Sequence, residues 1–342
     1  MRWGERLLLV WFALFVLALV APSPASAREE AAILLDYETG AVLDARNADD
    51  AIIPASLTKM MTLYLTFSAL SSGQLDLSSR LKVSDRAAAM PPTKLGLQSG
   101  DTIRVEDAIM GLVTRSANDA ASVLAEALGG SEDRFAMAMT RTARKLGMTR
   151  TVFRNASGLP DGEQRTTARD LARLATRLIQ DFPKQYGYFS SPSFIFRGRT
   201  HPNHNRLLAS YQGMDGLKTG YTQASGFNLA ASAVRGGRRL VAVVIGGRTA
   251  GARDATMVDL LDSGFAHGPR RPLEELEVAE RQQPGPSRAK SAVLAATDAE
   301  LSTPQRAELV VASLDGPASE VSAAPPPPRS NKMRSEGGAK PS

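Results

Sequence analysis

Apolar runs separated by polar turn residues lie at both ends of the segment between residues 28 and 268. Near its start, "AAILLDYETGAVLDARN" has one such run on either side of Glu38, Thr39 and Gly40, which predicts a β-hairpin with one apolar face. Near its end, "GFNLAASAV" and "LVAVVIGG" are separated by "RGGRR", which predicts two strands joined by a turn. Because the region between them has helical spacing, we expect an α+β fold with an antiparallel sheet assembled from both ends of the domain.

The central region predicts a cluster of helices. Segment 57–70 is the first, because its apolar residues recur at helical spacing. In segment 105–130, two helical runs are interrupted near Arg115 and Ser116, and the second run ends at a pair of glycines. Further helices are predicted over residues 131–147, 166–180 and about 254–263.

The first 27 residues have the pattern of a signal peptide. Arg2 and Arg6 precede an unbroken apolar run of 15 residues from Leu7 to Ala21. This run is short for a bilayer span, and a small-x-small end follows at Ala25 to Ala27. We therefore expect cleavage after Ala27 and export to the periplasm or to the cell-wall space.

The composition changes near residue 268. Residues 269–342 are rich in proline, alanine, serine and charge and lack aromatic residues, so they cannot bury enough apolar surface to offset the entropy of ordering. They also contain no strong amphipathic helix of the kind that holds a protein on a membrane. We predict one folded domain over residues 28–268, followed by a mostly disordered tail.

Composition also argues against several classes of function. The chain has no cysteine, so an exported form cannot use disulfides, thiol catalysis or thiolate metal ligands. Its three histidines, His201, His204 and His267, form no recognisable metal motif, which argues against a zinc enzyme. The net charge of +6 is spread along the chain without basic runs interleaved with aromatics, which argues against nucleic acid as a partner.

A serine three positions before a lysine occurs three times, so this spacing alone identifies nothing. One copy lies in a polar, turn-like stretch and another in the tail. The remaining copy opens the predicted helix 57–70, directly after a proline and an alanine. The three pairs are Ser56/Lys59, Ser79/Lys82 and Ser287/Lys290.

Ser56 and Lys59 have the placement that nucleophilic catalysis needs. Pro54 is favoured only at the start of a helix, which places Ser56 in the first turn, where unpaired N–H groups favour developing negative charge. Residues three apart share a helical face, so the Lys59 amine can lie beside the Ser56 oxygen. A desolvated lysine has a lowered pKa and can activate a serine as a base. Taken alone, however, the pair fits a structural role better than a catalytic one, with Ser56 as a helix cap and Lys59 reaching solvent.

Two further motifs change that balance. "TRSANDA" places Ser116 and Asn118 at the break between helical runs, where a hydroxyl and a carboxamide can face one cleft. "GLKTGYT" places Lys218, Thr219 and Gly220 on an expected edge strand before the last two strands, and the glycine lets a substrate backbone lie close. Each motif alone fits a helix cap or a surface turn. The three motifs occur in this order in an exported chain without cysteine, and such a combination is rare by chance. Together they therefore favour a catalytic role.

This set of motifs resembles that of penicillin-binding proteins and serine β-lactamases. Its details, "SLTK", "SAND", "NASGLPD", "NHNRLL" and "DGLKTGYT", look like those of the low-molecular-weight D-alanyl-D-alanine carboxypeptidases of the DacA type. The resemblance covers residues 30–268 and implies the β-lactamase/transpeptidase-like fold. It implies removal of the terminal D-alanine from peptidoglycan stem peptides ending in D-Ala-D-Ala, covalent inhibition by β-lactams, and no metal or organic cofactor.

The resemblance also implies catalytic roles. Ser56 would be the acylated nucleophile and Lys59 its general base. Ser116 would relay a proton toward the nitrogen of the leaving D-alanine. The backbone N–H groups of Ser56 and Tyr221 would form the oxyanion hole.

Four further residues would bind the substrate if the resemblance holds. Asn118 would orient the substrate amide and the catalytic lysine, and Lys218 would supply positive potential. Thr219 would contact the terminal carboxylate, together with Arg253. In the family an arginine follows the last strand, as Arg253 does here.

Two departures from the family pattern are visible. Relatives often have glycine in the middle of S-x-N, where this chain has Ala117. Many relatives continue into a β-rich second domain and an amphipathic membrane helix, and residues 269–342 look like neither. Membrane attachment through such a helix is therefore not expected.

Four alternative functions share parts of this pattern. A class A β-lactamase has the three motifs but adds a Glu-x-x-Leu-Asn segment, for which Glu163 is the nearest candidate and lacks both Leu and Asn. A DD-transpeptidase would form the same acyl-enzyme. A catalytically silent cell-wall binding module would have no need of all the polar motif residues. A Ser-His-Asp hydrolase is disfavoured, because no G-x-S-x-G is present and His204 lies in a polar stretch.

Overall fold

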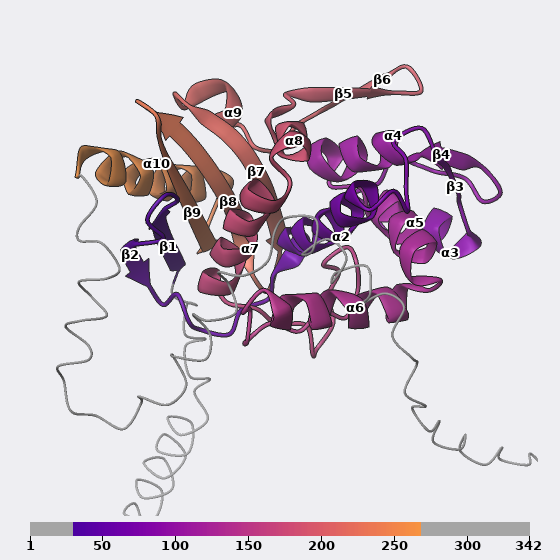
Figure 1. Ribbon diagram of the computed structural model, residues 1–342, viewed down its shortest axis with the longest axis horizontal. Coiled ribbons are helices and arrows are strands. Elements are labelled where there is room, and N and C mark those ends of the chain that lie inside the picture. Colours follow the sequence, from indigo (N-terminus) through magenta and orange to yellow (C-terminus); the bar gives the residue numbers. More distant parts are fainter. Residues whose placement is uncertain (1–29, 268–342) are drawn as a thin grey trace, which may run out of the picture.

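A single five-stranded antiparallel sheet, in the order β2-β1-β9-β8-β7, organises the molecule (Figure 1). The computed structural model describes residues 30–267, so the predicted leader and tail lie outside the described residues. Both predicted strand pairs are confirmed, and pairing of β1 with β9 joins the two ends of the domain. The strands of this sheet are β1 Ala31–Asp36, β2 Val42–Arg46, β7 Met214–Thr222, β8 Gly226–Arg235 and β9 Arg238–Gly247.

Helices account for most of the chain between β2 and β7, as predicted (Figure 1). Two small two-stranded sheets, which the sequence did not reveal, accompany them. The longer helices are α2 Lys59–Ser71, α5 Asn118–Gly129, α6 Glu132–Lys145, α7 Ala168–Asp181 and α10 Ala250–Ala266. The shorter helices and turns are η1 Ala55–Thr58, α3 Asp85–Ala89, α4 Val105–Met110, η2 Gly111–Arg115, α8 Pro183–Tyr186, η3 Gly187–Ser190 and α9 Leu207–Ser210. The small sheets pair β3 Arg80–Lys82 with β4 Thr102–Arg104, and β5 Ser193–Phe196 with β6 Arg199–Pro202.

The sheet has a hydrophobic core on each face. On β9, Val241 and Val243 belong to the larger core, which includes the helical cluster, whereas Ala242 and Val244 belong to the smaller core under α10. This alternation follows from the two-residue repeat of a strand, and it explains why β9 reads as a continuous apolar run. A sheet buried on both faces gives β7, its edge strand, a rigid support.

Helix α2 runs through the centre of the larger core. Its residues from Lys59 to Ala69 are all buried, and a helix that is apolar on every side is the expected occupant of such a position. It begins with the 3-10 turn η1, so Ser56 lies in the first turn, as predicted. The start of α2 therefore faces the end of the sheet where β7 lies, because η1 contacts β7.

Two predicted details differ in the structure. Helix α10 begins at Ala250 rather than near residue 254, because the Thr249 hydroxyl accepts a hydrogen bond from Ala252 N at 3.0 Å and caps it there. Lys82 lies in β3 rather than in a turn, because residues 80–82 pair with β4. Among residues 30–267, no helix is both long and apolar enough to cross a bilayer.

Candidate active site

A cavity of about 670 Å³ opens between the start of α2, the break before α5 and the edge strand β7. It brings together six of the eight residues that the sequence assigned to chemistry. Lys59 and Lys218 complete the set from beneath, since both are buried. The cavity is lined by Ser56, Pro92, Thr93, Ser116, Asn118, Ser157, Gly158, Leu159, Pro160, Pro202, Asn203, His204, Arg206, Thr219, Gly220, Tyr221, Thr222, Phe227, Ala250 and Arg253.

Ser56 is presented to the cavity by an unusual turn. Ala55 has a φ of +47°, a conformation that non-glycine residues rarely adopt, and it directly precedes the serine. Gly158 accommodates this turn, because a Cβ on Gly158 would lie 1.8 Å from the carbonyl oxygen of Ala55. The Ser56 side chain does not cap the helix, since neither η1 nor α2 has a side-chain capping bond. Its hydroxyl is therefore available for chemistry.

The Lys59 amine contacts three oxygen atoms. It lies 3.2 Å from Ser56 Oγ, and it donates to Asn118 Oδ1 at 2.8 Å and to the carbonyl oxygen of Ser157 at 2.5 Å. Amide and carbonyl oxygens only accept hydrogen bonds, so they occupy both N–H bonds of a neutral amine. The remaining lone pair is then left for the proton of the Ser56 hydroxyl. Lys59 is placed to act as the base for Ser56.

Electrostatics favour the neutral form of Lys59. Burial of the side chain is the largest effect, and with the nearby charge of Lys218 it holds the pKa of Lys59 well below its usual value. The carboxylates of Asp119 and Glu132 oppose this shift, because negative charge favours the protonated amine. The balance matters for a base, which must be unprotonated at the working pH.

Ser116 and Asn118 lie at an interruption between two helical segments, as predicted. The π-helix η2 ends at Arg115, Ser116 follows it with a φ of +58°, and α5 begins at Asn118. Asn118 Nδ2 donates to Pro91 O at 2.9 Å, which orients the amide so that its oxygen faces Lys59. Ser116 Oγ is buried at the cavity wall and makes no hydrogen bond within the described part of the chain. A hydroxyl without a partner here can exchange a proton with a bound substrate.

Strand β7 forms the opposite wall. It is the edge strand predicted for K-T-G, and its Gly220 lies against η1, because a Cβ there would be 3.1 Å from Ser56 N. Lys218 is buried and donates to Thr219 O at 2.9 Å. Burial, with the charge of Arg253, lowers the pKa of Lys218 to about 7. An anion bound in the cavity would restore the proton, since opposite charge favours the charged form.

Arg253 and Tyr221 lie at the end of the cavity near α10. Arg253 is buried, and it donates to the carbonyl oxygen of Asn228 at 2.8 Å and to Asp254 at 2.7 Å. These bonds hold its guanidinium at the cavity wall. The Tyr221 ring is 55% exposed and lies 4.4 Å from the ring of Phe227, so it borders the cavity mouth.

Sequence reasoning missed three contributors. The carbonyl of Ser157 bonds Lys59, although "NASGLPD" entered only as a detail of the resemblance. Asn155 in this motif shapes the loop, because its Oδ1 accepts from the backbone N–H groups of Ser157 and Gly158 at 3.2 and 2.7 Å. His204, expected in a polar stretch, lines the cavity, and burial with Lys218 lowers its pKa to about 4, so its imidazole is neutral at physiological pH.

One residue considered from the sequence lies apart from this chemistry, and no candidate metal site accompanies it among the described residues. Glu163, the residue considered for a β-lactamase-type water, is exposed and pairs with Arg154 at 3.2 Å instead of lining the cavity. Within residues 30–267, no group of three or more His, Asp or Glu side chains is arranged to hold a metal ion.

A serine beside a buried lysine with a lowered pKa, at an edge strand that carries K-T-G, defines the class of penicillin-recognising serine enzymes with a β-lactamase-like α+β fold. The family model described as peptidase S11, D-alanyl-D-alanine carboxypeptidase, matches residues 18–249. The chain belongs to this family.

Individual relatives agree with this assignment. The chain is 40% identical over 240 residues to the D-alanyl-D-alanine carboxypeptidase DacC of Escherichia coli K12, covering 68% of this chain and 60% of that protein. The chain thus spans about three fifths of that relative's length. Penicillin-binding protein 5 of Haemophilus influenzae has a similar structure, with a TM-score of 0.68, 34% identity, and 72% and 73% of the two chains covered. Penicillin-binding protein D2 of Listeria monocytogenes, solved with ampicillin bound, gives a TM-score of 0.64 at 33% identity, over 71% of this chain and 100% of that one.

Proposed function

We propose that the protein is a serine-type D-Ala-D-Ala carboxypeptidase, which removes the terminal D-alanine from peptidoglycan stem peptides. The observation that carries this proposal is the geometry of Lys59, whose nitrogen lies 3.2 Å from Ser56 Oγ and donates to Asn118 Oδ1 and to the carbonyl oxygen of Ser157. When the amine is neutral, these two acceptors take both of its N–H bonds and leave its lone pair for the Ser56 proton. That arrangement suits one task, removal of a proton from the serine hydroxyl.

Acylation transfers the peptide from D-alanine to Ser56. Lys59 takes the Ser56 proton, and Oγ attacks the carbonyl carbon of the penultimate D-alanine. The backbone N–H groups of Ser56 and Tyr221 stabilise the resulting oxyanion, at roughly 3–4 kcal/mol per donor. The proton passes through Ser116 to the amide nitrogen, the C–N bond breaks, and free D-alanine leaves with an ester remaining on Ser56.

Deacylation reverses the roles of the same groups. Lys59 takes a proton from a water molecule, whose oxygen attacks the ester carbon. The C–O bond to Ser56 then breaks, and Oγ receives the proton back from Lys59. A penicillin reacts in the first half in the same way, but its leaving nitrogen stays tethered to the acyl group. We infer that β-lactams therefore acylate Ser56 and persist there.

The substrate's terminal carboxylate is held by the far end of the cavity. Lys218 and Arg253 supply positive charge there, and Thr219 supplies a hydroxyl from the edge strand. This charge selects a peptide with a free C-terminal carboxylate, so cleavage removes one residue from the end. Such a substrate belongs to the cell wall, which fits the expected export of the chain and a catalytic domain over residues 28–268.

Lack of a suitable carboxylate argues against a β-lactamase. Glu163 is exposed and paired with Arg154, so it is not placed to activate a deacylating water. A DD-transpeptidase would share the acylation steps and differ in using an amine in place of water.

The test is release of D-alanine from a peptide ending in D-Ala-D-Ala, measured with and without an added amine acceptor. We expect release with water as the final acceptor. Rapid hydrolysis of penicillin without D-alanine release would overturn the proposal, and release that depends on the amine would favour the transpeptidase.

A further inference from the structure

A buried carboxylate lies directly behind the base. Glu132 stands in the first turn of α6 and is 3% exposed. An acidic residue in this turn commonly faces solvent and interacts with the helix dipole. Asp133, its neighbour, is exposed and already provides that interaction. Burying a second carboxylate costs desolvation, so its contacts require another explanation.

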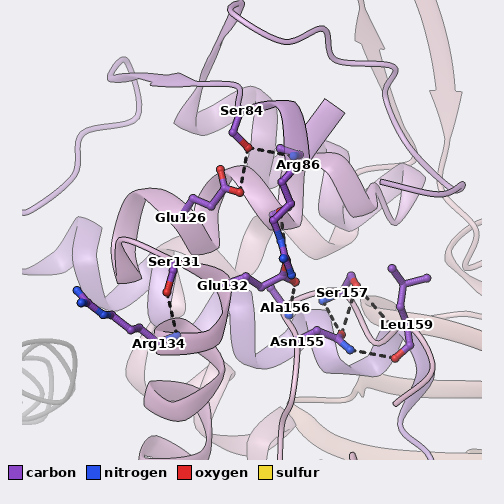
Figure 2. A network of polar contacts seen from close by, with 12 residues as sticks. Ser84, Arg86, Glu126, Ser131, Glu132, Arg134, Asn155, Ala156, Ser157 and Leu159 are labelled. Atoms are coloured by element: carbon purple, nitrogen blue, oxygen red, sulfur yellow. Dashed lines mark hydrogen bonds and ion pairs between the residues drawn. The ribbon is translucent and has the colours of Figure 1, made fainter. Parts of the chain in front are cut away.

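Glu132 connects both segments that hold Lys59. Figure 2 shows its carboxylate between Arg86 and the loop residue Ala156. Its Oε1 accepts from Ala156 N at 3.1 Å, one residue before the carbonyl that binds the lysine. Its Oε2 accepts from the Ser122 hydroxyl at 3.3 Å, one turn along α5 from Asn118, the lysine's other acceptor.

Two further contacts complete this connection. The carbonyl of Ala156 accepts from the Thr62 hydroxyl at 2.7 Å, which ties the same residue to α2 one turn after Lys59. On the outer side, Arg86 of α3 lies 3.1 Å from Oε2 and is itself largely exposed. The carboxylate is therefore held at a set distance from α2, α5 and the loop at residues 153–160.

We infer that Glu132 is a positioning residue for the catalytic base: through its bonds to Ala156 N and the Ser122 hydroxyl it fixes the two segments whose acceptors orient the Lys59 amine, and it places a negative charge within electrostatic reach of that amine. This inference rests on the proposed function. The charged and titratable groups that face Lys59 are Lys218 from β7, Asp119 from α5, Glu132 from α6 and His204 from the segment after β6. Glu132 and Asp119 favour the protonated amine, and Lys218 opposes it.

Two substitutions separate position from charge. In Glu132→Gln the amide oxygen can still accept from Ala156 N and its NH₂ group can donate to Ser122, so the contacts that reach the two lysine acceptors are kept, while the charge and the outer bond from Arg86 are lost. Lys59 then loses its proton at lower pH, so the acidic limb of penicillin acylation shifts to lower pH and the plateau rate is retained. In Glu132→Ala the buried N–H of Ala156 has no acceptor, and we expect the plateau rate to fall by roughly ten- to a hundredfold.

Glu126→Gln is the matched control. Glu126 lies in the same region (Figure 2) and accepts from Ser84 at 2.9 Å, but it has no bond to the loop that carries Ser157. Its substitution should leave the midpoint of the acidic limb unchanged. A purely structural role for Glu132 would lower the melting temperature in Glu132→Gln without moving that midpoint.

The decisive measurement uses full-length protein labelled with ¹³C at the lysine ε-carbons, with the Lys59 signal assigned by its loss in Lys59→Ala. Its titration midpoint should lie at lower pH in Glu132→Gln than in the wild type and in Glu126→Gln. An unchanged midpoint, together with an unchanged pH profile of acylation, would overturn the inference. If the midpoint moves but the wild type releases no D-alanine, the proposed function fails while the coupling between Glu132 and Lys59 stands.

Discussion

Replacing Lys218 with methionine should stabilise the protein, and it should do so more at pH 6 than at pH 9. In the folded state burial and Arg253 lower the pKa of Lys218 to about 7, whereas the unfolded chain has the ordinary value of 10.5. Between these two values the unfolded state binds a proton that the folded state lacks, so the free energy of unfolding rises with pH. Below pH 7 the folded state carries the buried charge, and the full penalty applies.

The size of the effect follows from the two pKa values. The gap between 10.5 and about 7 corresponds to about 5 kcal/mol of destabilisation at pH 6, at about 1.4 kcal/mol per pKa unit. At pH 9 the same linkage leaves about 2 kcal/mol. The comparison between the two pH values leaves a difference of about 3 kcal/mol. Changes in packing and the lost bond to Thr219 O affect the variant at both pH values, so they cancel in this difference. For a domain of this size it corresponds to about 6–12 °C in melting temperature.

Thermal melts of the wild type and Lys218→Met at pH 6 and pH 9 provide the assay. We expect the variant's gain in melting temperature to be several degrees larger at pH 6. Lys82→Met is the control, because Lys82 is exposed on β3 and meets water in both the folded and unfolded states, so its effect should not depend on pH. Equal gains at both pH values for Lys218→Met would refute the reasoning, since the buried lysine would then titrate as it does in water.

Three further predictions concern the base, the loop and the domain boundary. Lys59→Ala should stay folded and slow penicillin acylation about a hundredfold or more, and a rate near that of the wild type would assign the base elsewhere. Gly158→Ala should cost about 3 kcal/mol or more in urea unfolding, because its φ is +83° and a Cβ would lie 1.8 Å from Ala55 O, whereas Gly162→Ala has nothing within 4 Å and should be neutral. Removing residues 269–342 should leave D-alanine release within a few-fold, and a drop in melting temperature beyond about 10 °C would move the domain boundary.

The sequence predicted those parts of the molecule that depend on local pattern. Apolar runs bounded by turn residues located the β1–β2 and β8–β9 pairs, and helical spacing located α2, α5, α6 and α7. The break at Ser116 was predicted because helical periodicity stops there, and the structure places a left-handed residue at that position. The edge position of Lys218 followed from the order of the last three strands.

Contacts between distant segments were beyond the reach of the sequence. The third oxygen on Lys59 is a main-chain carbonyl at Ser157, and a carbonyl has no residue type by which a pattern can recognise it. Glu132 resembles any acidic residue in a first helical turn, and only packing against α5 and the loop reveals that it is buried. The burial of Lys218 was likewise hidden, because lysine on an edge strand ordinarily faces water.

The central claim is that Lys59 activates Ser56 as an acylated nucleophile. The most direct measurement is incubation of the protein with a penicillin, followed by intact mass and peptide mapping of the adduct. We predict one penicillin per chain, attached to the peptide at Ser56 and absent from Ser56→Ala. Folded protein that gains no mass, or an adduct that persists in Ser56→Ala, would contradict this account.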